Sequence, residues 1–199
     1  MGDRFVASDD PANEEAFMRG VILREFLDMV DRHFGPETTE HLSRIVGLTP
    51  ACFSDASAFP QVLRLARALS ERTGVEVREI ILNFGQTVFP KLAGMHPYLL
   101  VSPEGPLKML EAVIAASLEE LGGLDRESSV PRIVFEGPGN AACTLEWHSG
   151  RPVADFAEGL LRGWLSYCRG HAEIRRTDLP GPAGNNVRFS ISLAPTHAA

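Results

Sequence analysis

Cysteine is scarce in this sequence. Its 199 residues include three cysteines, Cys52, Cys143 and Cys168, which are widely spaced and form no Cys-x-x-Cys pair. Such spacing predicts neither a disulfide framework nor a zinc site. We expect the three thiols to be small core residues of a protein that works in a reducing compartment.

The sequence also lacks a long apolar run. No stretch approaches the roughly 20 apolar residues of a membrane-spanning helix, and the polar, acidic N-terminus contains no secretion signal. The formal net charge of −7 opposes binding to nucleic acid, which depends on cationic side chains that displace counterions from phosphates. We predict a cytoplasmic protein that binds neither nucleic acid nor membrane. The basic doublet of Arg175 and Arg176 is interpreted as the solvated edge of a strand.

The first half of the chain has helical periodicity. Residues 1–16 are rich in Asp, Pro and Asn, which predicts a flexible leader, and residues 17–199 are the right size for a single domain. Apolar residues then recur at intervals of three and four. This spacing predicts helices at residues 17–34, 37–46, 61–72 and 76–93. Gly47 and Gly74 stand where left-handed caps are usual, whereas Pro90 predicts a kink or an end in the fourth helix.

Beyond Gly123 the sequence becomes rich in strand-forming residues. Short runs bounded by turn residues predict strands at residues 132–135, 144–147, 172–177 and 187–193. A long apolar helix is predicted at residues 153–168, between the second and third strands. Antiparallel strands with a helix packed over one face make an α+β domain.

The junction between the second strand and this helix carries a candidate binding site. In an extended segment the side chains alternate, so Trp147, Ser149 and Arg151 point to one side while Glu146 and His148 point to the other. One face therefore presents an indole N–H, a hydroxyl and a guanidinium fork. These donors suit a carboxylate or a phosphate.

This junction resembles the tyrosine-x-serine-x-arginine motif of the H-NOX family, the haem-based nitric oxide and oxygen sensors related to soluble guanylate cyclase. Ser149 and Arg151 match the motif, and Trp147 stands in place of the tyrosine. The stretches MRGVILREFLDMVDRHFGPETTEHL and ERTGVEVREIILNFGQTVFPKL resemble the family's opening helix and its helix leading toward the haem side. The likeness runs from Met18 to Leu193.

The resemblance implies an H-NOX-like fold, in which a helical N-terminal part and a mixed C-terminal part enclose a pocket. In the family, the three motif side chains hold the propionates of haem. Trp147, Ser149 and Arg151 are therefore expected to contact the carboxylates of a ligand.

The helix predicted at residues 107–121 is expected to form the opposite wall of this pocket. Leu110, Ile114 and Leu118 lie on its continuous apolar face. In the family this helix presents the histidine that ligates the haem iron. Matching KMLEAVI to the family pattern places that histidine at Ile114, and counting back from Pro131 places it at Leu118.

Neither position is a histidine, and none occurs between His96 and His148. Iron in haem needs an axial lone pair from imidazole, thiolate, thioether or phenolate, which an aliphatic side chain cannot give. Met109 is expected to lie off the inner face of the helix, and burial in the core is the preferred interpretation of Cys143 and Cys168. A conventional histidine-ligated haem is therefore not expected.

The sequence does not predict an enzyme. Ser149 lacks the glycine spacing of a nucleophile elbow, and its neighbour His148 is expected on the opposite side of the strand. Two functions remain from different classes. In the first, the domain is a sensor whose pocket binds haem weakly or another amphipathic ligand, and it signals to a cyclase, kinase or chemotaxis protein. In the second, it is a ligand-free interaction module with a pocket filled by its own side chains.

The missing histidine leads to a spectroscopic prediction. Protein purified from haem-supplemented cells should lack the intense Soret band of a stoichiometric haem protein, because no imidazole is available to hold the iron. Absorbance spectroscopy of the purified protein checks this. A full-occupancy Soret band that responds to nitric oxide would contradict the prediction and direct attention to Met109, Cys143 or Cys168.

Overall fold

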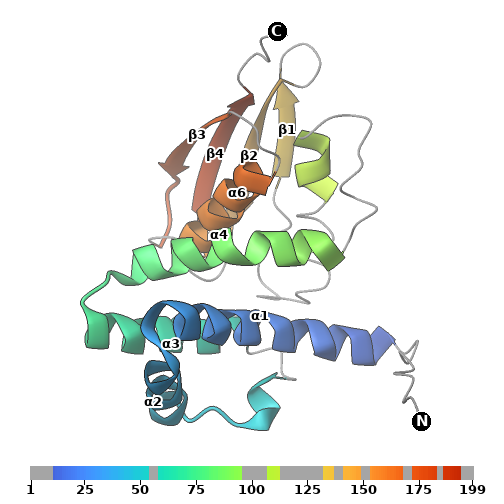
Figure 1. Cartoon of the computed structure of the whole chain (residues 1–199). Helices are drawn as coiled ribbons and strands as arrows, with labels where there is room; N and C mark the ends of the chain where they lie inside the picture. Colours follow the sequence, from blue (N-terminus) through green and yellow to red (C-terminus); the bar gives the residue numbers. More distant parts are fainter. Residues whose placement is uncertain are drawn as a thin grey trace, which may run out of the picture.

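The chain folds into a group of helices followed by an antiparallel sheet with one helix on its face. A computed structural model describes residues 11–53, 58–95, 107–112, 132–136, 141–148, 153–167, 172–182 and 186–193. Helices α1 to α4 come first, and the sheet with α6 comes second (Figure 1). The predicted α+β class is confirmed.

Helix α1 spans Pro11–Phe34, and α2 spans Pro36–Val46. Helix α1 starts before the predicted residue 17, because PANEEAF has little apolar periodicity but contains good helix formers and a proline suited to the first turn. Gly47 ends α2 in the left-handed conformation, with φ of 68°, as its position predicted. The division into a leader and one domain stays a prediction.

A short 3-10 turn, η1, spans Pro50–Phe53 before the next two helices. Helix α3 spans Ala58–Thr73, and α4 spans Val77–Met95. Pro90 lies inside α4 and does not end it. Among the described residues, no helix is long and apolar enough to cross a membrane.

Within the described residues, the sheet has four antiparallel strands in the order β1-β2-β4-β3. These strands are β1 at Arg132–Glu136, β2 at Ala142–His148, β3 at Ala172–Asp178 and β4 at Asn186–Leu193. Two hairpins, β1-β2 and β3-β4, are thus joined side by side, and α6 at Ala154–Tyr167 connects them along the chain. The strands and the connecting helix agree with the sequence predictions.

Helix α6 covers one face of the sheet (Figure 1). The side chains on this face are buried at Cys143, Leu145 and Trp147 of β2 and at Val187, Phe189 and Ile191 of β4. Helix α4 packs on α6 and makes its most extensive contact there. The core is therefore continuous from the sheet through α6 and α4 to α1 and α3.

The crossing of α4 and α6 brings two backbones into direct contact. A Cβ atom on Gly159 of α6 would collide with the Leu82 carbonyl oxygen and the Gly85 Cα of α4, and a Cβ on Gly85 would collide with the Phe156 carbonyl oxygen. One turn further along α6, a Cβ on Gly163 would lie 2.7 Å from the Gln86 carbonyl oxygen. Only glycine permits this separation of the helices.

Substitution of Gly159 by alanine should destabilise the fold. The added methyl group meets main-chain atoms that cannot rotate away, and overpacking of this kind costs about 1–3 kcal/mol. We expect a loss near the upper end in the free energy of unfolding, measured by urea denaturation. Gly94→Ala in α4 is the control, because nothing lies within 4 Å of its added Cβ and alanine favours a helix. Equal stability of the two variants would contradict the close crossing.

Candidate functional site

The predicted site lies partly within the described residues. Trp147 and Leu110 are both buried in the core. The other four residues predicted to line the site lie outside the described residues: Ser149, Arg151, Ile114 and Leu118. The structure therefore describes one residue from each of the two expected walls.

Trp147 is fixed by the sheet at the last inward-facing position of β2. It pairs with Val187 of β4, and its residue exposure is 3%. The neighbouring His148 is exposed, as strand alternation predicted. The Trp147 side chain thus points to the α6 side of the sheet, toward the interior.

The indole nitrogen of Trp147 is a buried donor that lacks an acceptor among the described residues. An unsatisfied buried donor costs about 1–3 kcal/mol, so native proteins usually supply a partner from the chain, from water or from a ligand. Trp164 of α6 has a second buried indole N–H of the same kind. The interior of this half of the domain therefore has two buried donors with which a hydrogen-bond acceptor could pair.

The helix at residues 107–112 contributes Leu107, Met109 and Leu110 to the core. Met109, which was expected off the pocket-facing stripe, is buried in the core with a residue exposure of 6%. Met109 and Leu110 are neighbours on a helix that is apolar over more of its circumference than the stripe through Leu110 alone. Lys108 and Glu111 form an ion pair of 2.8 Å on the remaining face.

Cys143 lies on the same face of β2 as Trp147 and is buried, as predicted. Burial raises the pKa of its thiol to about 11, and the carboxylates of Glu111 and Glu136 add to the increase. The thiol is therefore protonated at neutral pH, which disfavours it as a nucleophile or as a thiolate ligand. Cys168 lies outside the described residues.

Four phenylalanine rings fill the space where α1, α3, α4 and α6 meet. Phe26 contacts Phe84 edge-on with 5.1 Å between ring centroids, Phe84 stacks on Phe156 at 5.5 Å, and Phe156 contacts Phe59 at 5.2 Å. All four side chains are buried. This phenylalanine cluster joins the N-terminal helices to α6 without leaving that space to a ligand.

A cluster of charged side chains lies beside α4 and α6, and the sequence analysis did not predict it. Glu158 of α6 has a side-chain exposure of 8%, and it accepts hydrogen bonds from Arg162 at 2.5 Å and Arg176 at 3.1 Å. Arg78 of α4 lies 3.6 Å from Glu158 and 3.4 Å from Asp155. The charge cluster therefore links α4, α6 and β3.

Arg176 is the inward member of the basic doublet. The expectation of a solvated edge holds for Arg175, whose side chain is 75% exposed, but was wrong for Arg176, at 16%. Burial alone would lower the pKa of Arg176, but its hydrogen bonds to Asp155, Asp178 and Glu158 outweigh burial and raise the pKa. Strand alternation was the available signal, because it places adjacent residues on opposite faces.

The described residues contain no group of three or more His, Cys, Asp or Glu side chains that could hold a metal ion. The carboxylates of α6 are committed to arginines. What the described part of the site offers is an apolar interior with an unpaired hydrogen-bond donor.

Solved structures with a similar fold are H-NOX proteins. The H-NOX protein of K. algicida in the Fe(II) unliganded state has a TM-score of 0.67 at 23% identity, covering 90% of this chain and 98% of that one. The S. oneidensis H-NOX protein in the Fe(II)NO state has a TM-score of 0.69 at 20% identity, with coverage of 88% and 98%. Its NMR structure in the Fe(II)CO state gives 0.71 at 20% identity, again with 88% and 98% coverage.

The family profile described as Haem-NO-binding matches residues 19–176. A comparison with curated proteins gave no significant match. The fold and the profile define the class, an α+β sensor domain of the haem-binding type. This chain belongs to the haem-NO-binding family, whose domains are known as H-NOX.

The charge cluster generates a stability prediction. Glu158→Gln keeps the shape of the side chain but leaves buried Arg176 with less negative charge, and breaking a buried pair costs about 3–5 kcal/mol. Because Arg78 and Arg162 are half exposed, we expect about 3 kcal/mol, measured by denaturant unfolding. Glu173→Gln removes the exposed partner of Arg175 and should leave stability nearly unchanged, because solvent screens an exposed ion pair. A loss at Glu158 no larger than at Glu173 would refute the role of the cluster.

Proposed function

We propose that this chain is an H-NOX sensory domain with a degenerate haem site, which binds an amphipathic carboxylate-bearing ligand in the family pocket and signals to a partner protein. The observation that supports this proposal most directly is the buried indole N–H of Trp147 without an acceptor. Trp147 occupies the motif position whose side chain contacts haem propionates in the family. A ligand carboxylate there would supply the missing acceptor.

The carboxylate end of the ligand would be held by three groups. Trp147 donates its indole N–H, and in this proposal Ser149 donates a hydroxyl and Arg151 a two-pronged guanidinium hydrogen bond. Charge-assisted hydrogen bonds of this type contribute about 1.5–3 kcal/mol each. Their convergence would orient an anionic group at one end of the pocket.

The apolar body of the ligand would lie against the helix that starts at residue 107. Leu110 is buried there beside Leu107 and Met109. We place Ile114 and Leu118 on the same face, one of them at the position of the family histidine. Haem bound in this family supplies an iron for gaseous ligands, and no side chain at these two positions has a lone pair to hold that iron.

Signalling would pass to a separate protein. H-NOX domains signal to cyclases and kinases, and we propose a cyclase, kinase or chemotaxis protein as the partner of this chain. Ligand binding changes signalling only if the ligand binds two conformations with different affinity. The α4–α6 crossing is the contact through which the helical half would respond to the sheet half.

A second candidate function is a ligand-free interaction module. The phenylalanine cluster favours it, because four buried rings fill the meeting point of the two halves. In this case side chains of the protein fill the interior without a ligand. Arg151 would then form hydrogen bonds with carboxylates or backbone carbonyls of the chain itself. A buried guanidinium without such partners would be prohibitively costly.

Ligand-dependent melting of Arg151 and Trp147 variants distinguishes the two functions. If the pocket binds an amphipathic acid, protoporphyrin IX should raise the Tm of the wild type, and Arg151→Ala should weaken binding roughly 10- to 150-fold, the equivalent of about 1.5–3 kcal/mol. Trp147→Phe should also weaken binding, because it removes the indole donor along with part of the ring. Trp164→Phe is the matched control, since Trp164 has the same unpaired N–H but lies outside the motif.

A filled pocket gives the opposite pattern. Protoporphyrin IX would leave every melting curve unchanged, and Arg151→Ala would lower the Tm of the free protein. Trp147→Phe and Trp164→Phe would then shift the Tm alike, because each exchanges an unpaired buried donor for a smaller ring. Unchanged stability and unchanged binding in Arg151→Ala would show that Arg151 is a solvated surface residue. This result would contradict both functions, because each assigns Arg151 a partner inside the protein.

A further inference from the structure

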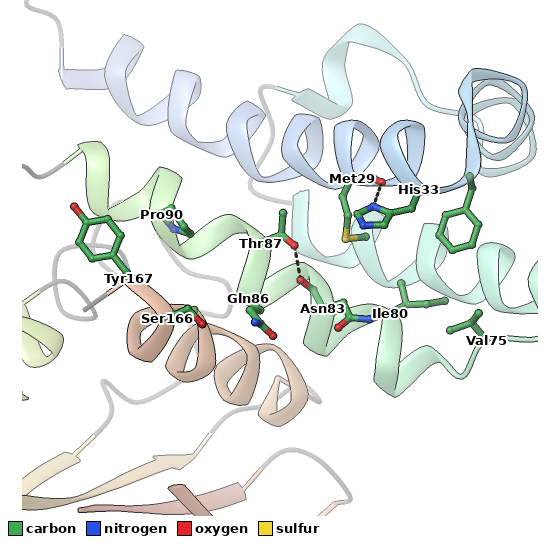
Figure 2. A pocket seen from close by; sticks show the side chains of 12 residues that line it. Met29, His33, Val75, Ile80, Asn83, Gln86, Thr87, Pro90, Ser166 and Tyr167 are labelled. Atoms are coloured by element: carbon green, nitrogen blue, oxygen red, sulfur yellow. Dashed lines mark hydrogen bonds between the residues drawn. The ribbon is translucent and has the colours of Figure 1, made fainter. Parts of the chain in front are cut away.

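A groove of about 590 Å³ lies over α4, between α1 and α6 (Figure 2). The outward face of α4 forms its floor through Ile80, Asn83, Gln86, Thr87 and Pro90. The end of α1 forms one wall with Met29, His33 and Phe34, and the last turns of α6 form the other with Gly163, Ser166 and Tyr167. Neither described residue of the predicted haem-type site lines this groove.

The centre of the floor presents two amide side chains, Asn83 and Gln86. They are three residues apart on α4 and therefore share one face of the helix. Both are exposed, and among the described residues neither side chain has a hydrogen-bond partner. Each amide offers one acceptor oxygen and two donor hydrogens, so the amide pair can match the edge of a molecule that carries both donors and acceptors.

The α1 wall adds an acceptor at a defined atom. Nδ1 of His33 lies 2.8 Å from the Met29 carbonyl oxygen, and because a carbonyl only accepts, Nδ1 must carry the proton. The neutral imidazole is left with a lone pair on Nε2. Across the groove, Ser166 and Tyr167 bring two hydroxyl groups.

Aromatic surface is exposed at two opposite places of the groove. Phe34 is 37% exposed and Tyr167 is 43% exposed, and they are two of the four large hydrophobic side chains that are exposed among the described residues. Figure 2 shows Tyr167 beside Pro90, with Val75 and Ile80 at the other end of the floor. Apolar ends thus flank a polar centre.

No Lys, Arg, Asp or Glu lines the groove within the described part of the chain. A charged ligand would lose hydration there without meeting an opposite charge, and the net charge of −7 further opposes an anion. The lining therefore favours a neutral ligand.

The size of the groove suits a small molecule. Its volume of about 590 Å³ falls within the range of about 300–1,000 Å³ that is usual for small-ligand sites. A docking helix would set its apolar side chains against the amide pair.

We propose that this groove binds a neutral heteroaromatic molecule of the nucleoside class. The planar base lies against the floor with its donor and acceptor edge on Asn83 and Gln86, and an aromatic end of the groove covers its apolar surface. Sugar hydroxyls reach Ser166, Tyr167 or Nε2 of His33. This second site is independent of the proposed haem-type pocket.

Adenosine is the probe, and binding to the full chain is measured by titration calorimetry. We expect saturable binding with a Kd below about 1 mM, and the double variant Asn83→Ala/Gln86→Ala should weaken it at least about tenfold because each lost hydrogen bond contributes roughly 1 kcal/mol. Both residues are exposed, so melting of the variant should match the wild type. Glu79→Gln is the control, because Glu79 is exposed on α4 but does not line the groove.

The charged analogue AMP tests the neutrality of the site and should bind more weakly than adenosine. Three results would overturn the proposal: absence of saturable adenosine binding, binding that survives the double substitution, or AMP binding as tightly as adenosine. Displacement of adenosine by protoporphyrin IX would show instead that the nucleoside occupies the haem-type pocket, and would also overturn the second site.

Discussion

The architecture depends on the direct backbone contact between α4 and α6. Gly85, Gly159 and Gly163 lack the Cβ atoms that would hold these helices apart. Because the backbones touch, the side chains that flank the contact can reach past it, and Phe156 of α6 meets Phe84 of α4 and Phe59 of α3. One helix crossing thus sets the distance between the helical half and the sheet half.

The charge cluster reinforces the same crossing from the side. Glu158 precedes Gly159 in the chain, so the residue that anchors Arg78, Arg162 and Arg176 is fixed beside the closest point of approach. A rigid contact of this kind transmits displacement, since packed interfaces have discrete arrangements and do not deform continuously. Any change that a ligand imposes on the sheet half would reach α4 through this contact.

The proposed haem-type pocket would have two chemically different ends. The described part of its polar end has a donor, Trp147 Nε1, that needs an acceptor, whereas the described part of the opposite wall is aliphatic and thioether surface around Leu110 and Met109. In the proposed function, an amphipathic acid would satisfy both ends without iron coordination. A site of this kind could therefore hold a carboxylate without an iron ligand.

The sequence by itself determined the local structure. Periodicity located α2, α3, α4, α6 and all four strands, and strand alternation placed Trp147 inside and His148 outside, because these properties follow from the geometry of a few consecutive residues. Partners that are distant in the chain were decided only by the tertiary structure. Arg176 looked like a surface charge, and nothing in the sequence pointed to the roles of Glu158 and Gly159. Each of these roles depends on which atoms another element brings within reach. The groove over Asn83 and Gln86 likewise exists only because α1 and α6 rise on either side of α4.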